Sequence, residues 1–172
     1  MVRRTSMSGM AGTDDWRADR IGSALRGENP TVLRRLRRGF AVMGDSQFLP
    51  GYCVLLADDP DVSRLSDMLR PARLEYLADI DQLAEAVEIG CRKLDPAFRR
   101  VNVEILGNTD PYLHTHVFAR YDWEPRESIG LPVWGYPRER WTDPAATLGP
   151  QHDALRTAIR DALDALGAPL RP

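Results

Sequence analysis

The sequence is poor in the residues that mark several protein classes. Its two cysteines, Cys53 and Cys91, are too few and too far apart to form a disulfide framework or a zinc ribbon. No apolar run approaches the roughly 18 residues of a membrane-spanning helix, and the N-terminus lacks the apolar core of a signal peptide. The formal net charge of -2 leaves no basic excess to grip nucleic acid. We therefore expect a cytoplasmic protein that binds neither membranes nor nucleic acid.

What is present is enough apolar material for one domain. The chain has 172 residues, of which 43% are hydrophobic. Residues 1–13 are small and polar, and we expect them to form a disordered tail. Asp14 and Asp15 can cap a short helix that runs to Arg26, and Gly27-Glu28-Asn29-Pro30 then breaks it.

The middle of the chain carries four strand signals and one long helical signal. The predicted strands cover residues 39–43, 52–56, 101–105 and 112–120. From about Ser63, apolar residues recur at three- and four-residue spacing, with Pro71 suited to a first helical turn. Asp95-Pro96 ends this helix. The first two strands are separated by turn residues, which predicts an antiparallel pair.

The C-terminal part predicts a different kind of structure. Beyond Tyr121 the chain is rich in Pro, Gly and Trp, which indicates an ordered but irregular cover. An apolar stripe from Leu148 to Leu166 then predicts a last helix. The whole pattern predicts an α+β fold, in which an antiparallel sheet carries a long helix and a C-terminal helical extension.

Two of the three histidines lie two residues apart on the last predicted strand. Because a strand sends alternate side chains to opposite faces, Tyr112, His114, His116, Phe118 and Arg120 share one face. The pair follows a loop of Gly, Asn, Thr, Asp and Pro, a setting that favours chemistry over packing alone. Two satisfied or surface histidines remain the structural alternative.

Two chemical interpretations compete for this pair. Histidines on one strand can hold a metal, but zinc or iron needs further ligands, and only Asp110 and Glu104 are near in sequence. The other interpretation is nucleophilic catalysis. A neutral imidazole attacks phosphorus well at neutral pH and forms a covalent intermediate that water later resolves.

The residues around the pair resemble the histidine triad (HIT) superfamily of nucleotidyl hydrolases and transferases. The family strand, His-φ-His-φ-His-φ-φ with φ apolar, is similar to Tyr112-Leu113-His114-Thr115-His116-Val117-Phe118. Two more family motifs follow the same order. A Gly-Glu-x-Pro helix end resembles residues 27–30, and a Pro-Gly-His step into a strand resembles residues 50–56. The resemblance spans about Asp14 to Tyr121.

The resemblance implies a HIT-like nucleotide-binding domain over residues 14–125, with residues 126–172 as an extension packed on it. It implies a hydrolase that acts at the α-phosphate of a nucleotide, such as a dinucleoside polyphosphate or a phosphoramidate. His114 would be the nucleophile, and His116 would hydrogen-bond a phosphate oxygen. The remaining family positions would bind the nucleotide. They are Asn108 at phosphate, Asp45 at ribose, and Phe40, Val42 and Phe48 at the nucleoside. Arg120 is a further phosphate-binding candidate because it shares the histidine face, and a solvated surface charge is its alternative role.

Two departures from the family pattern weaken the case for turnover. Tyr112 and Tyr52 stand where the family has histidines that support the nucleophile from behind. The loop after Asn108 lacks the usual Gly-Gln-Ser/Thr stretch and has Asp110-Pro111 instead, which removes an amide donor and adds a negative charge. The alternative is therefore a nucleotide-binding or sensing protein with weak or no catalysis.

The resemblance also bears on cofactors and partners. The partner expected is a small-molecule nucleotide. The chemistry requires no cofactor or protein-bound metal, although a divalent metal can accompany the nucleotide substrate. Since HIT relatives are frequently homodimers, a homodimer is one assembly that the resemblance implies.

Overall fold

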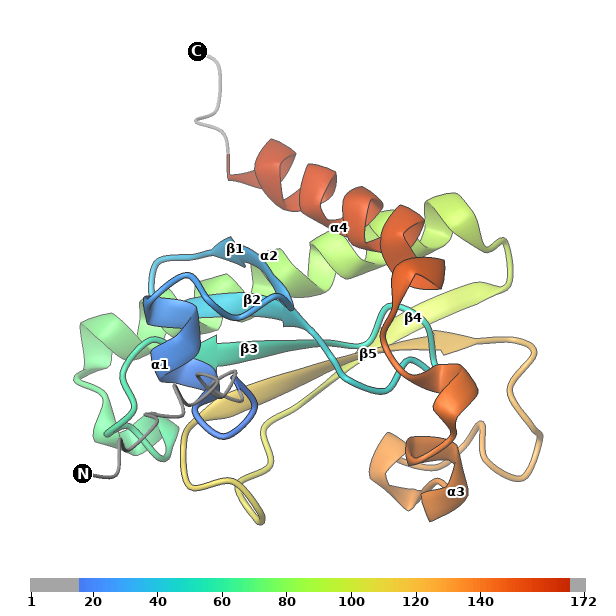
Figure 1. The fold of residues 1–172 in the computed structure, drawn as a ribbon, viewed down its shortest axis with the longest axis horizontal. Helices are drawn as coiled ribbons and strands as arrows, with labels where there is room; N and C mark the ends of the chain where they lie inside the picture. Colours follow the sequence, from blue (N-terminus) through green and yellow to red (C-terminus); the bar gives the residue numbers. More distant parts are fainter. Residues whose placement is uncertain (1–15, 168–172) are drawn as a thin grey trace, which may run out of the picture.

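The computed structural model describes residues 16–167, and its centre is a five-stranded antiparallel sheet with the order β1-β2-β3-β5-β4 (Figure 1). The strands are β1 (Val32–Arg35), β2 (Gly39–Met43), β3 (Cys53–Ala57), β4 (Phe98–Glu104) and β5 (His114–Tyr121). Two helices cover one face of this sheet, α2 (Arg70–Leu94) and α4 (Asp153–Leu166). The predicted α+β fold is confirmed.

The hairpin of β2 and β3 forms the middle of the core. Its register pairs Phe40 with Leu56 and Val42 with Val54, and every residue of both strands is buried. This antiparallel pair was predicted. The short edge strand β1 was not predicted, because its sequence Val-Leu-Arg-Arg has no clear alternation of apolar and polar residues.

The long helix α2 lies across the back of the sheet. It begins at Arg70. Pro71 lies in its first turn and the helix ends before Asp95, and both of these features were predicted. The start near Ser63 was wrong, because the Asp67 carboxylate accepts hydrogen bonds from the Ser63 and Arg64 amides and closes a separate 3-10 turn, η1 (Leu65–Asp67).

The C-terminal helix α4 packs directly against α2. A Cβ atom added to Gly90 would lie 2.7 Å from Cγ1 of Ile159, so the small residue permits this close approach. Ile159, Val133 and Tyr136 belong to the same hydrophobic core as the sheet. The division of the chain at residue 125 stays a prediction. Within residues 16–167, every helix is too short or too polar to be a membrane span.

The other elements lie toward opposite ends of the sheet (Figure 1). Helix α1 (Arg20–Leu25) is near one end, and its N-cap residue Asp19 accepts a hydrogen bond from the Gly22 amide at 2.9 Å. Near the other end are the turns η2 (Val133–Gly135), α3 (Arg138–Trp141), η3 (Pro144–Ala146) and η4 (Pro150–His152). The predicted tail 1–13 and the predicted caps Asp14 and Asp15 lie outside the described residues.

A buried ion pair ties the C-terminal segment to the end of β5. The Arg120 guanidinium donates to the Glu124 carboxylate, with Nε 2.9 Å from Oε2, and also donates to the backbone carbonyls of Ile129 and Leu131. The two side chains are 5% and 0% exposed. Glu124 accepts a further hydrogen bond from the Tyr136 hydroxyl. Because these hydrogen bonds join the end of β5 to residues 128–136, the network holds the irregular cover against the sheet.

Candidate active site

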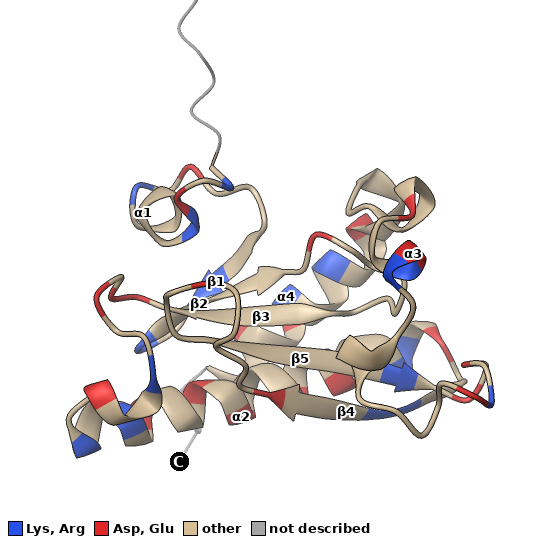
Figure 2. Cartoon of the chain, turned by 90° about the horizontal axis from the view of Figure 1, so that it is seen from below, with Lys and Arg blue, Asp and Glu red and all other residues tan. Residues whose placement is uncertain are grey.

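The histidine pair lies in the interior of the sheet, on the face that α2 and α4 leave open. Strand β5 pairs with β3 on one side, where His114 lies opposite Leu56 and His116 opposite Val54. The two imidazole centroids are 4.8 Å apart and nearly perpendicular. Figure 2 looks onto this face, where the middle of β3 and β5 carries no charged residue. The two imidazoles therefore lie on an uncharged part of the sheet.

One hydrogen bond fixes the proton of His114. Its Nδ1 lies 2.9 Å from the backbone carbonyl oxygen of Tyr112, which can only accept. Nδ1 therefore carries the hydrogen, and Nε2 keeps its lone pair. No other described side chain or backbone group forms a hydrogen bond with Nε2. The imidazole is held in the form that a nucleophile requires.

His116 is held by a tyrosine. The Tyr52 hydroxyl lies 2.8 Å from Nδ1 of His116, and the Tyr52 ring stacks on Phe118 at 4.4 Å between centroids. With the phenol as donor, His116 carries its hydrogen on Nε2. Tyr52 reaches this position because Gly44 has no side chain, since a Cβ there would lie 2.1 Å from Cδ1 of the tyrosine.

The two tyrosines and His116 are all uncharged at neutral pH. Burial, and then the neighbouring His114, lowers the pKa of His116 from 6.5 to about 4. Burial raises the pKa of both Tyr52 and Tyr112. His116 can therefore donate from Nε2 as a neutral group, but it does not bring a positive charge to the site.

Two cavities meet at the histidine pair. The first has a volume of about 290 Å³ and the second about 410 Å³. Both are lined by the same five residues, which are Tyr52, Asp110, His114, His116 and Trp141. The first cavity continues over the β2–β3 hairpin and under α1, whereas the second continues toward the loop after β4 and the C-terminal cover. A molecule bound at the histidines has room on both sides.

The charges around the first cavity are paired across it. Arg20 of α1 donates to the carboxylate of Asp45, which follows β2, and both residues line the cavity. Arg17 is a second, longer-range partner of Asp45 at 3.9 Å. Asp110 lines the cavity as well. Arg20 is therefore the one arginine or lysine among the described lining residues of the two cavities, and it faces two carboxylates.

The structure brings together some of the residues predicted from the sequence. Asp45, Tyr52, Tyr112, His114 and His116 line the first cavity, and Asn108 lines the second together with the histidines. Val42, which the resemblance placed at the nucleoside, also lines the first cavity.

Three predicted residues lie elsewhere. Arg120 shares the histidine face, but its guanidinium is buried on Glu124 and lines neither cavity. Phe40 is 3% exposed and lies under the Arg35 guanidinium, while Phe48 packs against Tyr136 and Trp141. Neither cavity is lined by Arg120, Phe40 or Phe48.

Three further residues line the cavities, Arg20, Trp134 and Trp141, and the sequence assigned none of them to the site. Arg20 reaches the site from a helix 25 residues before its partner Asp45, a distance over which no local pattern operates. Trp134 and Trp141 belong to the C-terminal cover, for which the sequence favours packing on the sheet over a stacking lid on the nucleotide pocket. Only the tertiary structure brings these residues beside the histidines.

Solved structures of other proteins share the fold of this chain. No protein-family model matches the sequence, and the curated proteins include no match. Solved structures do match. A histidine triad protein from Marinobacter aquaeolei VT8 is 21% identical over 79% of this chain and 90% of its own, with a TM-score of 0.61. The histidine triad protein blr8122 from Bradyrhizobium japonicum is 20% identical over 77% and 89%, with a TM-score of 0.62.

This chain has the histidine triad fold. A third similar structure, a hypothetical histidine triad nucleotide-binding protein from Sulfolobus tokodaii, is 10% identical and covers 85% of this chain and 91% of its own, with a TM-score of 0.61. At these identities the likeness establishes the fold, and the chemistry has to be argued from the residues of this chain.

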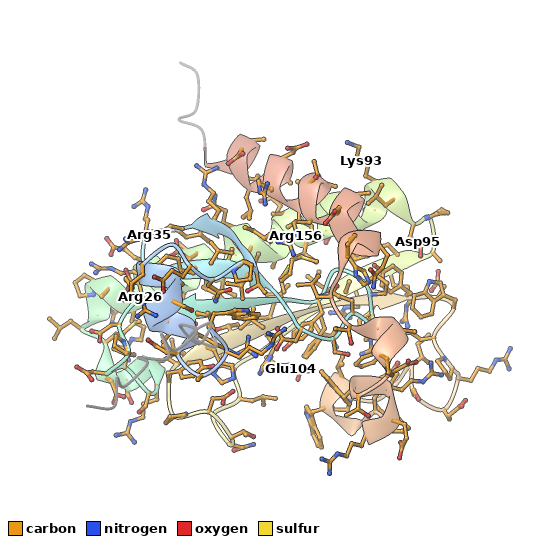
Figure 3. All side chains as sticks on the ribbon, viewed as in Figure 1. Arg26, Arg35, Lys93, Asp95, Glu104 and Arg156 are labelled. Atoms are coloured by element: carbon orange, nitrogen blue, oxygen red, sulfur yellow. The ribbon has the colours of Figure 1, made fainter. Side chains whose placement is uncertain are left out.

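A metal ion bound here would need a set of ligand side chains. Within residues 16–167, no group of three or more His, Cys, Asp or Glu side chains is arranged to hold a metal ion. Glu104 lies opposite His116 in the β4–β5 pair, and its side chain is on the side of the sheet away from α4 (Figure 3). Its Oε2 is buried without a partner, burial raises its pKa, and it lines neither cavity.

Proposed function

We propose that the protein is a nucleotidyl hydrolase that acts at the α-phosphate of a nucleotide, such as a dinucleoside polyphosphate, with His114 as the nucleophile. The observation that carries this proposal is the hydrogen bond from Nδ1 of His114 to the Tyr112 carbonyl oxygen. It leaves an unprotonated Nε2 on a residue that lines both cavities.

The reaction would take two displacements. In the first, the Nε2 lone pair of His114 forms a bond to the α-phosphorus, and the bond from phosphorus to the leaving phosphate oxygen breaks with its electron pair. The ring is then positively charged, and the Tyr112 carbonyl stabilises that charge through the hydrogen on Nδ1. In the second, water attacks phosphorus, the P–N bond breaks, and a proton leaves to solvent as the nucleoside monophosphate is released.

Two other residues would act on the phosphate charge. His116, neutral and held by Tyr52, would donate from Nε2 to a non-bridging oxygen. Arg20 would leave Asp45 for the phosphate, which at the same time would free the Asp45 carboxylate for the ribose hydroxyls. Without a nucleotide, Arg20 and Asp45 would thus neutralise each other, and nucleotide binding would separate them.

A turnover panel tests this function. Diadenosine polyphosphates and nucleoside 5′-phosphoramidates are incubated with the wild type, with His114→Ala, and with His152→Gln as the matched histidine control. We expect turnover in the wild type and the control and none in His114→Ala. His152 lies before α4 and lines neither of the two cavities, so loss of activity there would argue against a specific role for His114.

One observation favours binding without chemistry as a second candidate. The Asp110 carboxylate lines both cavities beside the histidines and would repel an anionic phosphate. Calorimetry distinguishes the two candidates. Micromolar binding of AMP or GMP, with no hydrolysis of any panel member by the wild type, would select the binding protein over the hydrolase.

A further inference from the structure

Trp134 is an exposed aromatic residue at the edge of the second cavity. It is 63% exposed and lines this cavity with His114, His116 and Phe118. Its ring stacks on no other aromatic ring of residues 16–167. Trp123, in contrast, is 48% exposed but stacks on Tyr121 at 4.7 Å between centroids. A large apolar ring left without a partner beside a cavity marks a binding surface.

The backbone on both sides of Trp134 is firmly held. Val133 is fully buried, and Tyr136 is buried with its hydroxyl donating to Glu124. Glu124 in turn pairs with Arg120 at the end of β5. The indole is therefore presented to the cavity by an anchored turn, so that a ligand would pay little to order it.

The rest of the second cavity suits a flat ring. Its walls include Phe118, Tyr52 and Trp141, and Trp141 is fixed by edge contacts to Tyr52 at 6.2 Å and to Phe118 at 6.0 Å between centroids. Asn108 adds a polar side chain to the lining. The first cavity shares Tyr52 and Trp141 but adds the Arg20–Asp45 ion pair and aliphatic strand residues. Phe118 and Trp134 line the second cavity and not the first.

We infer that the second cavity binds the leaving group of the substrate, that this leaving group carries an aromatic ring, and that the ring stacks on Trp134. The inference rests on the proposed function. His114 lines both cavities, so a phosphorus attacked by His114 would have its nucleoside in one cavity and its leaving group in the other. The nucleoside 5′-phosphate occupies the first cavity. The flat ring on the far side of the broken bond occupies the second.

Two esters of ATP test the inference. The γ-benzyl and γ-cyclohexylmethyl esters share the attacked phosphorus and the departing diphosphate, and they differ only in whether the terminal ring is flat and aromatic. We expect kcat/KM of the wild type to favour the benzyl ester by about tenfold, since stacking on an aromatic side chain commonly contributes that much. Trp134→Ala should abolish the preference, and Trp134→Phe should restore part of it.

Trp123→Ala is the matched control, because it also removes an exposed indole but lies outside both cavities. It should keep the full preference. If both esters are hydrolysed and Trp134→Ala leaves their ratio unchanged, the subsite is wrong while the proposed function stands.

If no panel nucleotide is hydrolysed, the proposed function fails and the subsite is tested by calorimetry instead. Tighter binding of the benzyl ester, lost in Trp134→Ala, would support the subsite. Equal binding of the two esters, or a preference that survives in Trp134→Ala, would overturn it.

Discussion

Acidification should destabilise the protein through His116. Its pKa in the folded state is about 4, against 6.5 for an ordinary histidine, so the unfolded chain binds an extra proton between these values. Stability from the neutral ring is therefore complete above about pH 6.5 and is lost as the pH falls toward 4. One pKa unit corresponds to about 1.4 kcal/mol, and the partial exposure of His116 reduces the total to on the order of 2 kcal/mol.

Urea unfolding at a series of pH values measures this effect. His116→Gln is the reference, because it removes the titrating ring and keeps every carboxylate that also titrates in this range. The free energy of unfolding of the wild type should fall by about 2 kcal/mol more than that of the variant between pH 7 and pH 4. Parallel curves, or an NMR titration of the His116 ring near pH 6.5, would refute the account of a neutral, buried imidazole.

Three further substitutions test other parts of the structure. Glu124→Gln should lower the free energy of unfolding by about 3 kcal/mol in urea, because it leaves the buried Arg120 cation without its counter-charge. Gly51→Ala should cost about 2 kcal/mol or more in the same assay, since φ is +94° and a Cβ would lie 2.2 Å from Sγ of Cys91. Arg20→Gln should raise KM for nucleotide substrates about tenfold with little change in kcat, whereas Arg20→Lys should recover part of the affinity. An unchanged KM would show that Arg20 serves only to hold α1.

The strands and the long helix were predictable because their signals are local. The apolar runs of β2 and β3, the alternation in β4 and the three- and four-residue spacing in α2 each extend over one element. The edge strand β1 was not predicted, because it forms by pairing with β2 and its own residues show no alternation of apolar and polar side chains. The turn at Asp67 was not predicted either. Hydrogen bonds to the Asp67 side chain form a separate turn before α2, where the sequence predicted the first part of that helix.

In the candidate site, too, local patterns predicted some residues and long-range packing placed the others. His114 and His116 share a face because a strand alternates, which the sequence alone predicts. Arg20 reaches the site through long-range packing, which no spacing in the sequence predicts. For Trp134 the sequence favoured packing over a lid on the nucleotide pocket, and the structure has it line the second cavity. The position of Arg120 on the strand was predicted correctly, but its guanidinium pairs with the buried Glu124 and does not line either cavity.

The stereochemistry at phosphorus tests the central claim most directly. A dinucleoside polyphosphate with a chiral α-phosphorothioate is hydrolysed in heavy-oxygen water, and the configuration of the released nucleoside phosphorothioate is determined. Attack by His114 followed by attack by water gives two inversions, so the account predicts net retention. Net inversion would mean that water attacks phosphorus directly, and it would contradict the role of His114 as the nucleophile.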